Sequence, residues 1–152
     1  MANKFKERFA KSHEAVALTA EWFSKQGCSN IKIPKFTVAP SHKDWKKHTD
    51  DGDLYVSNKR IEVKGLTGRH YWFTNNHEYP FSSWIICAKH SYDRAKPKPH
   101  AYIIWNCNRT HFGIIKTETF DMWRVLNLKD PNYPTRQDFY IINKLFVEVR
   151  AK

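Results

Sequence analysis

The stretch from Asp53 to Lys64 constrains the fold more than any other part of the sequence. On both sides of a short turn-forming segment (Ser57, Asn58 and Lys59), apolar residues alternate with more polar ones. This alternation is typical of strands that pack one face against a core, and two such runs around a turn predict a β-hairpin. We therefore expect a sheet in which the apolar side chains of this hairpin lie on the buried face.

The length of the turn decides which residues share the other face. Side chains alternate along a strand, so Glu62 and Lys64 project from the same side. If Ser57-Asn58 is a two-residue loop, Asp53 lies opposite Glu62. If Asn58-Lys59 is the two-residue loop instead, Asp53 lies opposite Lys64. A three-residue loop would instead pair Asp53 with Val63 and break the arrangement. The hypothesis that Asp53, Glu62 and Lys64 share one face thus requires a two-residue loop.

Two carboxylates on one face need compensation. About 4 Å apart at an effective dielectric near 20, they would repel by roughly 4 kcal/mol. Lys64 offsets part of this repulsion, and a hard divalent cation would offset the rest. Mg²⁺ accepts one or two carboxylates with waters and substrate phosphates, and the Val63 carbonyl could join them. The alternative interpretation is a cross-strand ion pair on a solvated sheet.

The remaining segments predict a mixed fold. Asn3–Gln26 has apolar residues at helical spacing and is followed by Gly27, a helix stop. A second helix is expected from Thr117 through Leu126, and 40–51 and 92–100 are expected to be loops. The further strands are expected at Ile31–Val38, Tyr71–Thr74, Trp84–Ala88, Ala101–Trp105, His111–Ile115 and Phe139–Val149. This pattern favours an α/β (α+β) fold with a central mixed sheet flanked by helices, in a single domain spanning 1–152.

The charge balance indicates a polyanionic partner. The chain has 26 Lys and Arg against 15 Asp and Glu, a net charge of +11. Such an excess attracts nucleic acid, because each neutralised phosphate releases counterions. A basic protein with no such partner is the alternative.

Compartment and metal type follow from the cysteines, histidines and apolar runs. Three cysteines without a CxxC pair indicate reduced thiols and a cytosol-like compartment. The N-terminus has no apolar signal-peptide core, and no apolar run is long enough for a membrane span, so we expect a cytoplasmic protein with no membrane partner.

The spacing of Cys and His does not support zinc. Asn75-Asn76-His77 lacks the ββα pattern of an HNH nuclease.

Two basic segments near the hairpin are candidates for phosphate contacts. The run from His42 to His48 places cations around an aromatic ring that could stack on a base, or it is a solvated loop whose tryptophan covers core. After the hairpin, Gly65 and Gly68 permit close approach of a backbone and Arg69 could contact a phosphate, although a plain turn is equally compatible. The candidate DNA-binding residues are Lys43, Trp45, Lys46, Lys47 and Arg69.

The order of these residues resembles the PD-(D/E)xK nuclease superfamily. Asp53 and then Glu62-Val63-Lys64 within RIEVKG match the family's acidic residue and (D/E)xK strand. The resemblance covers 11–65 and implies a restriction-endonuclease-like fold with Asp53, Glu62 and Lys64 as catalytic residues. Asp53, Glu62 and the Val63 carbonyl would be the metal ligands.

The resemblance also extends to the N-terminal helix. The family often adds a glutamate from this helix, and SHEAVALTAEWFSKQG offers Glu14, with Glu21 as the alternative. One departure is that no proline precedes Asp53, which leaves Asp50 and Asp51 as rival ligands.

The resemblance implies a Mg²⁺-dependent DNA endonuclease, with Mn²⁺ as a substitute. The small size favours recognition of junctions, flaps or ends over a long sequence, as in nucleases of phages and mobile elements; for a phage protein the compartment would be the host cytoplasm. A homodimer would supply the two active sites that cutting both strands requires. The alternatives are a non-catalytic nucleic-acid-binding protein on the same fold and an RNA nuclease.

Overall fold

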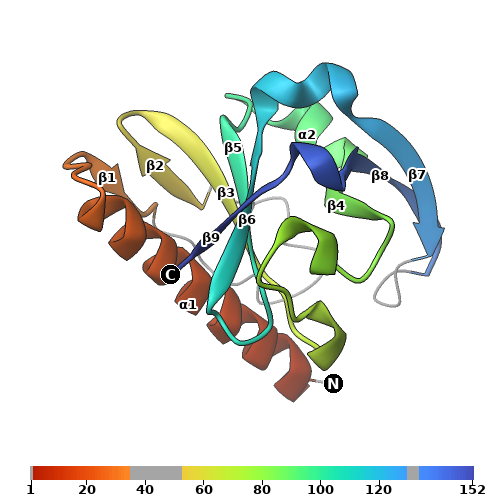
Figure 1. Ribbon diagram of the computed structural model, residues 1–152, viewed down its shortest axis with the longest axis horizontal. Coiled ribbons are helices and arrows are strands. Elements are labelled where there is room, and N and C mark those ends of the chain that lie inside the picture. The colour runs from red at the N-terminus through yellow and green to blue at the C-terminus, as the bar shows by residue number, and fades with distance from the viewer. Residues whose placement is uncertain (1, 35–52, 130–133) are drawn as a thin grey trace.

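The computed structural model describes residues 2–34, 53–129 and 134–152 (Figure 1). The N-terminal helix α1 (Ala2–Lys25) confirms the predicted helix almost to the residue. It ends before Gly27, whose φ of 93° lies in the left-handed region that glycine adopts without steric cost.

Next to α1 lies a six-stranded mixed sheet with the strand order β1-β2-β3-β5-β6-β9. Strand β3 pairs with β5 in parallel, and every other neighbouring pair is antiparallel. The six strands are β1 (Ile31–Lys32), β2 (Leu54–Val56), β3 (Lys59–Gly65), β5 (Ala101–Trp105), β6 (His111–Lys116) and β9 (Glu148–Ala151).

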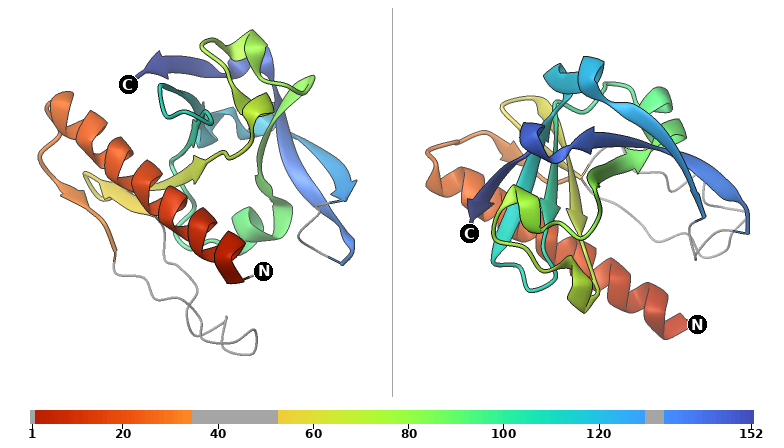
Figure 2. Two further views of the ribbon diagram at one scale, coloured as in Figure 1. Left: turned by 90° about the horizontal axis from the view of Figure 1, so that it is seen from below. Right: turned by 45° about the vertical axis from the view of Figure 1, so that its right-hand side comes forward.

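Helix α1 covers one face of this sheet (Figure 2). Ala15 and Val16 of the helix are buried against a cluster that includes Ile61 and Val63 of β3. Buried Thr19 accepts a hydrogen bond from the Trp105 indole at 2.8 Å. Because strand side chains alternate, Glu62 and Lys64 project from the face that α1 does not cover.

A second, three-stranded sheet packs on the other side, in the order β4-β8-β7. Its strands are β4 (Ser83–Ala88), β8 (Arg136–Asn143) and β7 (Arg124–Lys129), all antiparallel. Trp84 and Ile142 of this sheet share an apolar cluster with Ile104 and Ile115 of the six-stranded sheet. A Cβ at Gly113 would lie 2.6 Å from the Trp84 ring, so this position on β6 admits only glycine without rearrangement.

Short helical segments connect the strands. They are the 3₁₀ turns η2 (Arg69–Tyr71), η3 (Asn76–Glu78), η4 (Thr117–Met122) and η5 (Lys144–Phe146) and the helix α2 (Lys89–Arg94). None of the helices in the described residues is both long enough and apolar enough to cross a bilayer.

The predicted mixed α/β fold class is confirmed, but several segments were predicted wrongly. The strand expected at Phe139–Val149 is divided by η5 into β8 and β9, which belong to different sheets. Of the strand expected at Ile31–Val38, only Ile31–Lys32 is a strand in the described residues, and 35–38 lie outside them. Tyr71–Thr74 is not a strand. Tyr71 is the last residue of η2, and the residues after it are irregular, with Phe73 fully buried and Trp72 exposed. The helix expected from Thr117 is a 3₁₀ segment, and Leu126 lies on β7. The loop expected at 92–100 begins inside α2. For the segment from Thr117, packing of aromatic rings outweighs local preference, since Trp123 packs on Tyr92 at 5.2 Å between ring centroids.

Candidate active site

The β2–β3 hairpin closes through the two-residue loop that the hypothesis requires. Ser57 and Asn58 have φ of 50° and 66°, the left-handed values that tight hairpin turns need at both loop positions. Val56 pairs with Lys59 and Leu54 pairs with Ile61. One step further along the ladder, Asp53 stands opposite Glu62, as expected for the first of the two registers.

Asp53 is held against the backbone of the opposite strand. The Val63 amide donates a hydrogen bond to Asp53 Oδ2 at 2.8 Å. The His100 amide donates to the Arg60 carbonyl at 2.7 Å. The backbone groups of Arg60 therefore point towards β5, and so do those of the other even-numbered residues of β3, because the direction alternates along a strand. The Val63 carbonyl therefore points to the same side as Asp53, past the end of β2.

Glu62 has a partner that sequence reasoning missed. Arg60 Nε donates to Glu62 Oε1 at 2.7 Å, and Arg60 Nη1 donates to the Pro97 carbonyl at 3.2 Å. The Glu62 side chain is only 22% exposed. Arg60 lies two residues before Glu62 and hence on the same strand face, and this spacing was the available signal. The ion pair fixes one carboxylate oxygen of Glu62.

Lys64 sits in a desolvated position beside the two acids. Burial lowers the pKa of its ammonium group, and the charges of Cys87, Glu62 and Asp53 act in the opposite direction. Burial also raises the pKa of the Cys87 thiol, and the nearby Lys64 ammonium opposes that shift. Lys64 is thus the cation placed among the acidic groups of this face.

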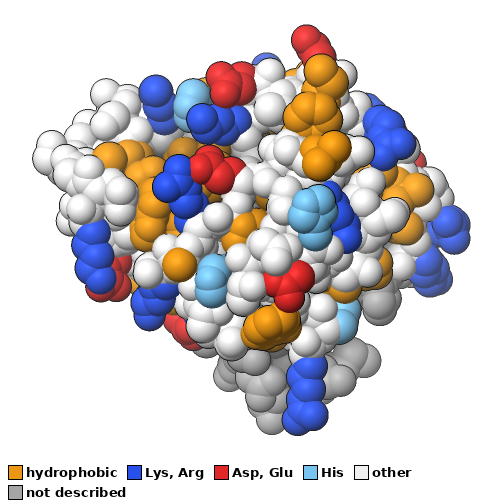
Figure 3. All heavy atoms as spheres, in the orientation of Figure 1, with side chains coloured by type: hydrophobic (Ala, Val, Ile, Leu, Met, Phe, Trp, Pro, Cys, Tyr) orange, Lys and Arg blue, Asp and Glu red, His pale blue; other side chains and the backbone are white. Residues whose placement is uncertain are grey.

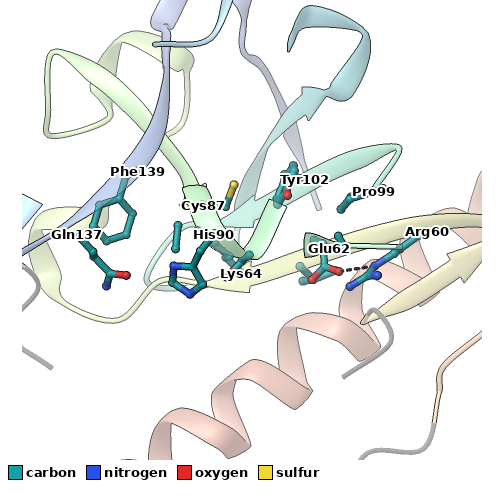
Figure 4. A pocket seen from close by; sticks show the side chains of 13 residues that line it. Arg60, Glu62, Lys64, Cys87, His90, Pro99, Tyr102, Gln137 and Phe139 are labelled. Atoms are coloured by element: carbon teal, nitrogen blue, oxygen red, sulfur yellow. Dashed lines mark hydrogen bonds and ion pairs between the residues drawn. The ribbon is translucent and has the colours of Figure 1, made fainter. Parts of the chain in front are cut away.

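Glu62 and Lys64 line a cavity of about 340 Å³, which we call the carboxylate pocket (Figure 4). Its other walls come from β4, α2, β5 and β8, and include Cys87, His90, Tyr102, Gln137 and Phe139. Tyr102 faces Glu62 because the two are register partners in the parallel β3–β5 ladder. Sequence reasoning missed these wall residues, since their proximity depends on pairing between strands far apart in the chain.

Glu14 does not join this group. Glu14 Oε1 lies 4.0 Å from Nε of buried Arg109, a nitrogen with no hydrogen-bond partner among the described residues. The Arg109 guanidinium also donates to the Leu66 carbonyl at 2.7 Å. The helix residues next to Glu14 pack on the sheet face opposite to Glu62 and Lys64. The structure therefore gives Glu14 the role of charge partner to Arg109, and the alternative Glu21 pairs with Lys25 at 3.1 Å in solvent.

The candidate DNA-binding residues are only partly described. Arg69 is exposed on η2, consistent with a phosphate contact and with a plain turn. The basic loop residues Lys43, Trp45, Lys46 and Lys47 lie outside the described residues, as do the rival ligands Asp50 and Asp51.

The candidate metal donors are two carboxylates and one carbonyl. Within 2–34, 53–129 and 134–152, no group of three or more His, Cys, Asp or Glu side chains could hold a metal ion. Asp53, Glu62 and the Val63 carbonyl form a smaller set of oxygen atoms only. Such a set suits a hard cation that completes its shell with water and phosphate, and does not suit structural zinc.

Comparisons with known proteins add no assignment. No protein-family model matches this chain, and no curated protein or solved structure is significantly similar to it.

Proposed function

We propose that this protein is a Mg²⁺-dependent DNA endonuclease whose catalytic residues are Asp53, Glu62 and Lys64. The proposal rests on one observation: the hairpin register that brings Asp53 opposite Glu62, with Lys64 next on the same face. Of these three residues, Glu62 and Lys64 line the carboxylate pocket. Spacing in the sequence alone left two registers open.

The donor chemistry fits Mg²⁺. Asp53 and Glu62 are each oriented through one oxygen, by the Val63 amide and by Arg60 respectively. Mg²⁺ needs only one oxygen from each carboxylate, with the Val63 carbonyl, waters and a substrate phosphate as further ligands. Bound there, the cation would polarise the scissile phosphate and lower the pKa of a coordinated water. Mn²⁺, which accepts the same oxygen donors, should substitute.

The protein's own groups would position and stabilise the reaction. The Lys64 ammonium can donate to the attacking water and to phosphate oxygens, where negative charge develops. The attacking water releases one proton to solvent as its oxygen forms the new bond to phosphorus, the bond from phosphorus to the 3′-oxygen breaks, and that oxygen takes up a proton from solvent. By the resemblance stated above, the products carry a 5′-phosphate and a 3′-hydroxyl.

The charge favours a nucleic-acid substrate. The net charge of +11 supports binding to a polyanion. On the face shown in Figure 3, Lys and Arg side chains are spread out rather than gathered in one patch. A homodimer with two such pockets would cut both strands.

Cleavage by a Glu62→Gln protein tests the proposal. We expect at least about a hundredfold slower cleavage of circular single-stranded, linear duplex and junction DNA in Mg²⁺ or Mn²⁺. Gln keeps the shape of the side chain but removes a charged ligand. Weaker Mn²⁺ binding, measured by calorimetry without DNA, should accompany the loss.

A Glu118→Gln protein is the matched control, because Glu118 is an exposed acid that pairs only loosely with Lys116, at 3.9 Å. It should cleave like the wild type. If Glu62→Gln and wild type cleaved equally well, the assigned centre would be wrong.

The second candidate is a non-catalytic nucleic-acid-binding protein. The Arg60–Glu62 ion pair favours it, because this pair neutralises one acid without any metal. Such a protein would bind DNA in a salt-sensitive manner, with no cleavage and no Mn²⁺ binding in the same assays. Including an RNA strand of matched sequence tests the alternative of an RNA nuclease.

A further inference from the structure

A second and larger hollow, of about 870 Å³, adjoins the carboxylate pocket. We call it the apolar hollow. The two share Lys64 and Phe139, so they meet at the proposed catalytic lysine. The residues of the apolar hollow that carry the argument are His70, Tyr71, Phe81, Leu126, Leu128 and Lys129.

One wall of the apolar hollow is a sheet face that is not used in the core. On β7 and β8, Leu126 pairs with Phe139, and both side chains point into the hollow. The opposite face of β8 carries Tyr140 and Ile142, which belong to the core cluster between the sheets. Leu126 is 41% exposed, so this wall remains open to solvent.

The facing wall is aromatic. The rings of Tyr71 and Phe81 lie 6.0 Å apart between centroids, and the His70 ring lies 4.1 Å from that of Tyr71. Phe81 is 43% exposed although it is a large apolar side chain. Exposed rings beside an aliphatic wall form a slot for a flat apolar group.

The charges at the hollow suit a polyanion. Among the described residues, its lining includes Lys64 and Lys129 and no Asp or Glu. A ligand there would carry apolar surface into the slot and negative charge at its rim, which is the chemistry of a nucleotide strand.

We propose that the apolar hollow binds the bases of an unpaired DNA strand whose scissile phosphate lies at the carboxylate pocket. In a duplex the base faces are stacked on one another, whereas an unpaired strand can offer them to aromatic and aliphatic side chains. The volume lies within the roughly 300–1,000 Å³ of small-ligand sites, which suits a few bases and not a duplex. This inference rests on the proposed function, and it names single-stranded DNA or a flap as the substrate class.

The test is binding of fluorescein-labelled dT12 in EDTA, measured by anisotropy, so that no cleavage is required. Leu126→Asp places a negative charge in the slot, and Val125→Asp places the same charge on the neighbouring residue, which lies on the other face of β7 with 49% exposure. We expect Leu126→Asp to weaken binding at least about tenfold and Phe81→Ala about five- to a hundredfold. Val125→Asp should change it less than about threefold.

Each other outcome overturns the inference. Equal weakening by the two Asp variants would show that only overall charge matters. Wild type that binds a 12-base-pair duplex as tightly as dT12 would remove the preference for unpaired bases. A concentration-dependent dimer that Leu126→Asp alone dissociates, with dT12 binding unchanged, would assign the hollow to a second copy of the chain.

The same variants separate this inference from the proposed function. If Leu126→Asp binds and cleaves normally while Glu62→Gln is inactive, the nuclease stands and the base-binding hollow falls. If dT12 binding follows the expected pattern but no DNA is cut with any metal, the hollow stands and the nuclease falls. Because Leu126 and Phe81 are exposed, neither substitution should unfold the protein, and thermal melting checks this.

Discussion

The Lys64 side chain occupies a buried position that disfavours its charged form. Burial is the largest cause of its lowered pKa, and the neighbouring acids compensate only in part. Between the folded pKa and the higher unfolded pKa, the unfolded chain binds more protons, so the free energy of unfolding rises with pH in that window. At any pH where Lys64 is charged in the folded protein, its desolvated ammonium group therefore costs stability, a common property of residues retained for chemistry.

Lys64→Met tests this trade-off. The substitution removes the desolvated charge and keeps most of the side-chain volume. We expect the free energy of unfolding in Mg²⁺ to stay constant or to rise by about 1 kcal/mol, and cleavage to fall at least about a hundredfold. Urea denaturation and single-turnover cleavage provide the two measurements.

Lys89→Met is the matched control, because Lys89 forms an exposed ion pair with Asp93 at 2.6 Å. It should leave cleavage unchanged. Intact cleavage in Lys64→Met, together with a clear loss of stability, would make Lys64 a structural residue only.

At this scale, the residues of one local segment were predictable and their neighbours were not. Strand alternation grouped Glu62 and Lys64, and it added Asp53 on condition of a two-residue loop, because all three lie within one hairpin. It could not reveal that Tyr102 stands beside Glu62, because a parallel ladder between distant strands sets that contact. Nor could the sequence show that Glu14 lies beside buried Arg109, which comes from a distant turn.

At the scale of elements, the β2–β3 turn carries the geometry of the site. Both loop residues adopt left-handed φ, yet neither is glycine. Asn tolerates this region better than Ser does, and Asn-Gly is the pair that such turns prefer. The native turn is therefore not the most stable one for its shape.

The double substitution Ser57→Asn with Asn58→Gly should raise the free energy of unfolding by up to about 1 kcal/mol. Cleavage should stay at the wild-type rate, because the register between Asp53 and Glu62 is kept. Ser57→Val, which resists a left-handed φ, should destabilise the protein by about 1–2 kcal/mol. Urea denaturation measures both, and a stability order opposite to this one would contradict the assigned turn.

The elements that sequence patterns missed are those decided by distant rings. Phe120 and Trp123 have a spacing that fits a helix, yet they pack on Tyr92 and Tyr140, and the chain turns directly into β7. By contrast, β5 was predicted with its observed bounds, because its run of buried apolar residues fits no other element as well.

At the scale of the whole molecule, charge should govern affinity for DNA. For about four contacted phosphates on a single strand, raising the salt from roughly 50 to 200 mM should weaken dT12 binding about 50-fold. Anisotropy titrations in EDTA measure this slope. A salt-independent affinity would show that phosphates contribute little, in conflict with the net charge of +11.

The topology has a consequence for the time at which the protein gains activity during its synthesis. The acids and the lysine belong to an early hairpin, but Gln137 and Phe139 of the pocket lie on β8, and the sheet is completed by β9 near the C-terminus. Contacts between distant segments form late, because closing long loops costs entropy before any contact is gained. During synthesis the chain would therefore contain Asp53, Glu62 and Lys64 long before the pocket residues on β8 were in place. For the proposed nuclease, nucleic acid near the ribosome would meet an incomplete site, and cutting would begin only after β8 and β9 had joined the fold.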